Sequence, residues 1–151
     1  MAIGTITGLL KRINVKQGRP SMAVLELTCT AGAAGDANAG LFPATVINPL
    51  AVNSDGSLFD IRGMKLYSVK AYPGATAPTD ATDATITDDY SIDLLGGKGT
   101  NLIDSASKTW IMAGPPDSYM PALITGNITL TITNNEVASA VTTIILELVG
   151  D

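Results

Sequence analysis

The hydrophobic pattern is clearest in the last third of the chain, where apolar and polar residues alternate from Asn127 to Thr133. Alternation with a period of two places every second side chain on the same face, so this segment is predicted to be a strand. A second run, from 141 to 149, is apolar on both faces through its middle. This favours a strand inside a sheet with both faces covered. We expect the two runs to pair as an antiparallel hairpin across their polar break.

The rest of the chain divides into short apolar runs separated by glycine, proline and acidic residues, without a convincing long helix. These runs predict strands at 22–30, 44–47, 58–72, 84–87 and 91–95 and a short segment at 109–112, with loops or turns at 31–40, 53–57, 73–80 and 96–99. The alternation is blurred between Lys65 and Lys70. The runs 84–87 and 91–95 are predicted to form a second hairpin, because a turn at Asp88 and Asp89 keeps a carboxylate off an apolar face.

Many short strands between glycine- and proline-containing turns favour an all-β fold, either an antiparallel β-sandwich or a jelly-roll-like barrel with short strands and long loops. The 151 residues are long enough for one domain with a full core. We assign residues 21–151 to a single β-sandwich domain. Residues 1–20 have isoleucines and leucines at helical spacing but also helix-opposing glycines and threonines, so we expect an extended N-terminal arm or an edge strand.

Composition narrows the possible partners. Charged residues make up 15% of the chain, against about a quarter in ordinary soluble domains. Either other subunits cover part of the surface, or threonine, serine and asparagine keep it hydrated. The net charge is −5, and Lys11-Arg12 is the main basic cluster, so we expect no direct nucleic-acid partner. The start of the chain does not resemble a signal peptide and no apolar run approaches ~18 residues, so we expect synthesis in a cytoplasm and no membrane partner.

The sequence contains few residues suited to catalysis or to binding a metal or cofactor. The chain has no histidine, which removes the commonest general base and transition-metal ligand. The segment Gly96–Thr100 lacks the spacing of a phosphate-binding loop. Acidic residues at 80, 83, 88 and 89 offer oxygen ligands for calcium, but such residues also bond to their own turns. We expect no enzyme, no cofactor and no metal, and a buried, unreactive Cys29.

The aromatic residues allow two interpretations. Trp110 and tyrosines 67, 72, 90 and 119 would suit a platform for sugar rings. Aromatic residues make up only 5% of the chain, and we therefore favour Trp110 as a core residue or a subunit-contact anchor.

Two segments, Ala81–Asn101 and Ala122–Thr133, carry a resemblance to known proteins. The first segment consists of a predicted strand, an acidic turn, the sequence Asp-Leu-Leu-Gly-Gly and a loop of glycine and asparagine. The second segment contains the alternating strand, which begins directly after a glycine. In this order they resemble small β-rich structural proteins encoded in the head and tail gene modules of tailed bacteriophages and prophages. The resemblance covers about residues 58–149 and brings no catalytic residues. The chain departs from it at Asp89-Tyr90, where Asp-Gly is typical.

The resemblance implies a virion structural protein, made in the bacterial host cytoplasm and then located in the virion. We expect a capsid decoration (cement) protein on the outer head surface that bridges capsid subunits, with the major capsid protein and copies of itself, as a homotrimer, as partners. The alternatives are a neck, tail or baseplate protein, or a carbohydrate-binding adhesive module. Besides the loop 31–40, the predicted subunit contacts are Ile3, Ile6, Leu9, Leu10, Ile13, Phe42 and Trp110.

Overall fold

A computed structural model describes residues 4–13, 22–52 and 58–150 of the chain, and in these residues it contains strands and turns but no helix. The strands are β1 (Thr5–Ile13), β2 (Met22–Thr30), β3 (Thr45–Ile47), β4 (Leu50–Val52), β5 (Leu58–Asp60), β6 (Lys65–Pro73), β7 (Asp83–Thr87), β8 (Thr109–Met112), β9 (Ala122–Leu123), β10 (Ile128–Thr133) and β11 (Val141–Val149). All their pairings are antiparallel. The prediction of an all-β fold is therefore confirmed. In this part of the chain we find no helix that is long and apolar enough to cross a membrane.

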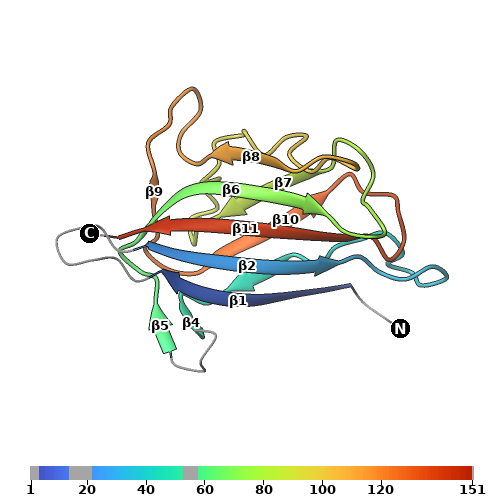
Figure 1. Ribbon diagram of the computed structural model, residues 1–151, viewed down its shortest axis with the longest axis horizontal. Coiled ribbons are helices and arrows are strands. Elements are labelled where there is room, and N and C mark those ends of the chain that lie inside the picture. Colours follow the sequence, from blue (N-terminus) through green and yellow to red (C-terminus); the bar gives the residue numbers. More distant parts are fainter. Residues whose placement is uncertain (1–3, 14–21, 53–57, 151) are drawn as a thin grey trace.

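The largest sheet has the order β1-β2-β11-β6-β8, and β9 also pairs with β6 (Figure 1). Its centre is β11, which pairs with β2 along one edge and with β6 along the other. The interior position predicted for residues 141–149 is thus confirmed. Side chains on one face of β11, including Ile144 and Leu146, are fully buried, but those on the other face are only half-buried. The prediction that both faces are covered is wrong for the single chain.

A second sheet, of order β3-β10-β7, lies behind the large one in Figure 1. Ile128 and Leu130 of β10 and Ile86 of β7 are fully buried and belong to the same hydrophobic core as the buried face of β11. Each such side chain contributes about 1.5–3 kcal/mol by leaving water. The two sheets therefore hold each other through one core. The finer distinction between a sandwich and a jelly-roll-like barrel stays a prediction.

The predicted hairpin between the last two long strands is wrong, because β10 and β11 belong to different sheets. The segment between them is a corner held by the buried side chain of Asn135. Its Oδ1 accepts a hydrogen bond from the backbone N–H of Thr79 at 2.9 Å, and its Nδ2 donates to the carbonyl oxygens of Gly40 at 2.7 Å and Val137 at 3.0 Å. These bonds satisfy a buried amide with groups from three loop segments, which a simple hairpin turn would not offer.

The second predicted hairpin is half right. The turn after β7 forms, with the N–H of Asp88 donating to the carbonyl of Ile92 and the Asp88 carboxylate accepting from the N–H groups of Tyr90 and Ile92. The returning segment is not a strand, because it makes a single bridge, between Thr87 and Asp93, and then turns away. The predicted strands at 22–30, 44–47 and 109–112 and the loops at 31–40 and 96–99 are present. The predicted turn at 53–57 lies outside the described residues.

The amino-terminal segment is an edge strand. Residues 5–13 pair with β2 over nine consecutive positions, from Thr5 opposite Thr30 to Ile13 opposite Met22. Of the two alternatives for residues 1–20, the structure therefore shows the edge strand for residues 5–13.

Candidate interaction surface

The seven predicted contact residues have different environments. Ile6 is partly buried and packs against the core, and Phe42 is 8% exposed and belongs to the core, so it has little surface left for another subunit. Trp110 is 62% exposed, which rules out a core role and leaves its role as a contact residue a prediction. Residues Leu9, Leu10 and Ile13 lie on β1, but their side chains are outside the described set, as is Ile3 altogether.

The position of Trp110 follows from the pairing of β8 at the edge of the large sheet. β8 pairs with β6 so that Trp110 lies opposite Lys70 and Ile111 lies opposite the fully buried Val69. Successive side chains of a strand point to opposite faces. Ile111 therefore turns toward the core, and Trp110 turns to the outer face of the sheet.

Exposed apolar side chains gather around this edge. Of the ten large hydrophobic residues exposed in the described part of the chain, five come from β6, β8, β9 and the segment that joins β8 to β9. We call these five the β8 surface: Tyr67, Trp110, Tyr119, Met120 and Leu123. Isolated exposed apolar residues are ordinary, whereas a group of them on neighbouring elements marks an interaction site.

The loop 114–121 carries two of these residues beyond the sheet, as the segment between β8 and β9 shows in Figure 1. Lys98 fixes its shape, because its ammonium group donates to the carbonyl oxygens of Ala113, Pro115 and Ser118. The same Nζ lies 5.5 Å from the centre of the Tyr119 ring, a cation–π distance. The loop is thus anchored at its base while Tyr119 and Met120 remain 72% and 68% exposed.

Gly114 is required at the start of this loop. Its φ is +117°, and a Cβ at this position would lie 2.0 Å from the carbonyl oxygen of Met120. Only glycine fits such a close approach at positive φ. The N–H of Gly114 also donates to the carbonyl of Leu94 at 2.8 Å, which ties the loop to the segment after β7.

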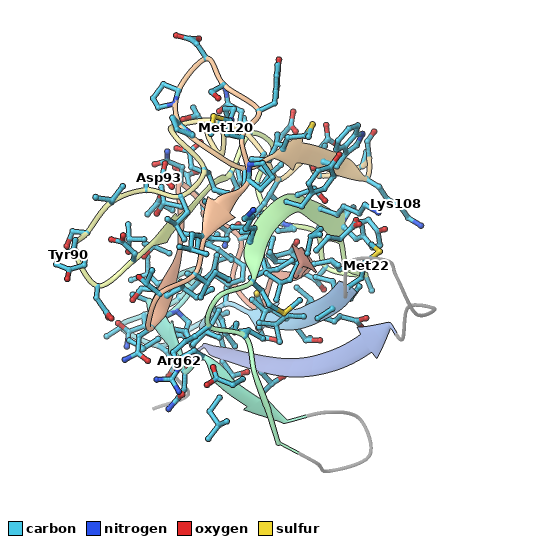
Figure 2. All side chains as sticks on the ribbon, turned by 90° about the vertical axis from the view of Figure 1, so that its left-hand side faces the viewer. Met22, Arg62, Tyr90, Asp93, Lys108 and Met120 are labelled. Atoms are coloured by element: carbon cyan, nitrogen blue, oxygen red, sulfur yellow. The ribbon has the colours of Figure 1, made fainter. Side chains whose placement is uncertain are left out.

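Next to the loop lies an apolar pocket of about 290 Å³, which we call the proline pocket. It is lined by Ile92, Asp93, Leu94, Gly114, Pro115, Pro116, Met120, Pro121 and Ala122. Figure 2 shows Met120 at the top of the molecule with Asp93 below it, and Tyr90 on the side opposite Lys108. Met120 therefore joins the β8 surface to a pocket that suits an apolar side chain of a partner.

A more polar pocket, of about 400 Å³, lies on the outer face of the large sheet beside Trp110. We call it the Trp110 pocket, and its lining consists of Tyr67, Ser68, Lys70, Trp110 and Glu147. Lys70 and Glu147 form an ion pair across β6 and β11. The Glu147 carboxylate, through hydrogen bonding and then charge, raises the pKa of the Lys70 ammonium group. The Lys70 ammonium group therefore stays charged at neutral pH.

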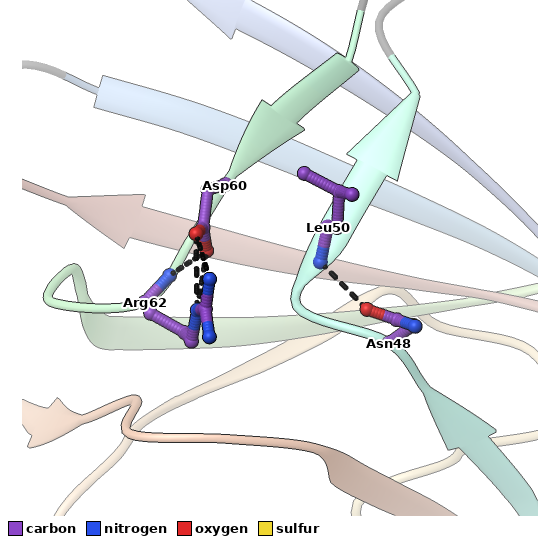
Figure 3. Close-up of polar contacts among 4 residues, drawn as sticks. All are labelled: Asn48, Leu50, Asp60 and Arg62. Atoms are coloured by element: carbon purple, nitrogen blue, oxygen red, sulfur yellow. Dashed lines mark hydrogen bonds and ion pairs between the residues drawn. The ribbon is translucent and has the colours of Figure 1, made fainter.

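A second polar cluster lies at the ends of β4 and β5 (Figure 3). The Asp60 carboxylate accepts hydrogen bonds from the backbone N–H and Nε of Arg62, both at 3.0 Å, and the Asn48 side chain accepts from the N–H of Leu50 at 2.9 Å. The Arg62 side-chain bonds lower the pKa of Asp60. All these contacts join residues two positions apart and the ion pair is exposed, so they shape the ends of the two strands and add little stability.

Two of the acidic residues considered as calcium ligands, Asp83 and Asp88, accept hydrogen bonds from other groups of the chain. Besides the Asp88 turn, the Asp83 carboxylate accepts from the N–H of Asn101 at 2.7 Å and from the side chain of Asn134. Within residues 4–13, 22–52 and 58–150, no three acidic or cysteine side chains come together as a set of metal ligands. Cys29 is fully buried, and this burial raises the pKa of its thiol to about 12, so the thiolate that would act as a nucleophile does not form at neutral pH.

Of the five aromatic candidates named from the sequence, the structure brings Trp110, Tyr67 and Tyr119 together around two adjoining hollows, and Tyr72 and Tyr90 do not line them. Sequence reasoning missed Lys98, Met120 and Glu147. Their roles depend on which strands are neighbours in the sheet, and nothing in the local pattern signals that. The fold and surface define an all-antiparallel β protein with an exposed aromatic edge. No known protein family, no curated protein and no solved structure matches this chain.

Proposed function

We propose that this protein is a structural component of a tailed-bacteriophage virion, a decoration protein on the outer head surface that bridges capsid subunits. The observation that carries the proposal is the β8 surface, with Tyr119 and Met120 held outward on a loop that Lys98 anchors. A protein of low charge that presents apolar side chains on a preorganised loop is suited to binding another protein surface. The resemblance of residues 58–149 to phage structural proteins points in the same direction.

The proposed contact places Met120 and the proline pocket against the major capsid protein. Burying a methionine side chain in a partner contributes about 1.5–3 kcal/mol, too little for tight binding by one residue. A repeated lattice offers many equivalent contacts, and a trimer would engage several at once, so that modest affinities combine. The acidic chain, with its net charge of −5, is suited to the outer side of the shell, away from packaged DNA.

The test is to purify particles from the host that encodes the chain and to measure its copy number by quantitative mass spectrometry. A decoration protein is expected at roughly hundreds of copies per particle, as the repeated symmetry of a shell requires. A few to some dozens of copies would instead indicate the alternative position in the neck, tail or baseplate. Complete absence from purified particles would refute both.

A matched pair of variants tests the contact itself. Met120→Asp places a charge on the β8 surface, whereas Val46→Asp introduces the same charge at a residue that is 60% exposed on β3. We expect purified Met120→Asp protein to lose binding to particles that lack the wild-type chain, and Val46→Asp protein to bind them. Equal binding by both variants would show that the β8 surface does not face the capsid.

A further inference from the structure

The Trp110 pocket combines an exposed aromatic ring with polar groups that face the same space. Trp110 is 62% exposed and Tyr67 is 41% exposed, and both line the pocket. Trp110 also borders a second hollow, of about 420 Å³, on the side of Tyr119. Open space therefore lies beside Trp110 in two directions, so a ligand longer than one ring has room to pass over the indole.

A β-bulge shapes the floor of the Trp110 pocket. Along β6 and β11 the register shifts so that Glu147 lies opposite Ser68 while Leu148 lies opposite Leu66. Tyr67 is the extra residue of this bulge. A bulge re-aims side chains, and here Tyr67 and its neighbour Ser68 both line the pocket, which an unbroken strand would not allow.

The polar groups of the pocket define the kind of ligand. The Lys70–Glu147 pair supplies a hydrogen-bond donor and an acceptor, while its two charges compensate each other. Glu147 Oε1 is buried and, apart from Lys70, finds no hydrogen-bond partner among the described residues. A buried carboxylate oxygen favours a further donor. A charged ligand would gain no net attraction from this compensated pair, and a purely apolar one would leave the ion pair desolvated and unbonded.

We infer that the Trp110 pocket binds a neutral oligosaccharide, with the apolar face of one pyranose ring on the Trp110 indole and its hydroxyl groups bonded to Glu147 and Lys70. A pyranose has an apolar face of C–H groups and a rim of hydroxyls that both donate and accept. It is uncharged, and it matches the mixed lining of the pocket. This binding site goes beyond the virion role and does not depend on it.

The intrinsic fluorescence of the protein tests the inference directly, because Trp110 is the single tryptophan of the chain. The full-length protein is titrated with maltohexaose, cellohexaose, N-acetylchitohexaose and mannohexaose up to roughly 10 mM, which covers dissociation constants in the millimolar range. With at least one of them we expect a saturable blue shift of the emission, since a sugar ring displaces water from the indole. The absence of a saturable change with all four would overturn the inference.

Three variants test whether the sugar occupies this pocket. Glu147→Gln removes the charged acceptor and is expected to weaken binding roughly ten- to a hundredfold, and Tyr67→Ala is expected to weaken it as well. Tyr90→Ala removes a tyrosine that is 81% exposed on the side of the molecule opposite Lys108 (Figure 2), and it should leave the affinity unchanged. Thermal unfolding of each variant verifies that it is folded. Folded Glu147→Gln and Tyr67→Ala proteins that both retain wild-type affinity would refute the assignment.

A second copy of the chain could occupy the Trp110 pocket instead of a sugar, and this would give a different fluorescence signal. If Trp110 lies in a contact between copies of the chain, its emission shifts with protein concentration in the absence of sugar, in the range where analytical ultracentrifugation detects association. Emission that does not change with protein concentration supports a free sugar site. A shift that follows association, with no effect of sugar, assigns the surface to a second copy and overturns the inference.

Discussion

Replacing Asn135 by alanine should destabilise the whole protein, because this one side chain ties together the corner between β10 and β11. The Asn135 side chain is buried at that corner, where it bonds to Thr79, Gly40 and Val137. Alanine cannot make these bonds. The truncation leaves the N–H of Thr79 and the buried carbonyl of Gly40 without their partner, and neither group is replaced by an apolar one.

The magnitude follows from these two backbone groups. The buried carbonyl of Gly40 left without a partner costs about 1–3 kcal/mol, and the part-buried N–H of Thr79 costs less, so the change should reduce the free energy of unfolding by about 2–4 kcal/mol. Domains of this kind are stable by about 5–15 kcal/mol in total. The corner joins the two sheets, so its loss should destabilise the whole fold rather than one loop.

Urea unfolding followed by far-UV circular dichroism measures the effect. With a slope of about 1–3 kcal/mol/M, the midpoint of the Asn135→Ala transition should fall by roughly 1–3 M. The control is Asn127→Ala, the same change at an exposed residue, which should alter stability by no more than about 0.5 kcal/mol. A loss below about 1 kcal/mol with an unchanged slope would show that the amide does not hold the two sheets together.

Three further predictions concern the core, an ion pair and the thiol. Leu130→Ala, at a fully buried position of β10, should cost about 2–5 kcal/mol in urea unfolding, whereas Val46→Ala on the exposed face of neighbouring β3 should cost no more than about 0.5 kcal/mol. Arg62 lowers the pKa of Asp60 from 3.8, so the ionised Asp60 stabilises the fold above that pH, and this stabilisation is lost as the pH falls through the lower pKa of the folded state. The melting temperatures of wild type and Asp60→Asn should therefore converge on acidification. A constant difference between them down to pH ~2 would contradict this. Cys29, buried with a pKa of about 12, should not react with a thiol reagent at pH ~8 until urea unfolds the chain, and rapid reaction of the native protein would be inconsistent with its burial.

The alternation of the sequence was sufficient to predict which residues face the core, because a period of two is a local property of the strand. Ile128 and Leu130 are buried as the pattern requires, and so is Cys29 on β2. The pairing of strands was not predictable in the same way. Any two amphipathic strands present the same kind of face, so the sequence of β10 and β11 did not distinguish a hairpin from a crossing between sheets.

The sequence left the environment of Trp110 undecided for a related reason. Thr109-Trp-Ile-Met112 carries apolar residues at successive positions, so either Trp110 or Ile111 satisfies the pattern as the inward residue. Only the pairing with β6 decides between them. The blurred alternation between Lys65 and Lys70 has a physical cause as well, since the bulge at Tyr67 interrupts the period of two within that strand.

The bulge also explains why the pocket and the projecting loop lie side by side. One edge of β6 is shared by two strands, with β8 opposite Ser68–Ala71 and β9 opposite Lys65 and Leu66. A strand edge pairs with one partner at each position, so the chain that joins β8 to β9 must leave the sheet at Tyr67, where Ala113 donates its N–H to the Tyr67 carbonyl at 3.0 Å. The same residue therefore ends one pairing, lines the Trp110 pocket and sets the base of loop 114–121. Removing the bulge by deletion of Tyr67 should consequently disturb sugar binding and particle binding together, whereas Tyr67→Ala, which keeps the backbone and loop 114–121, should weaken sugar binding far more than particle binding.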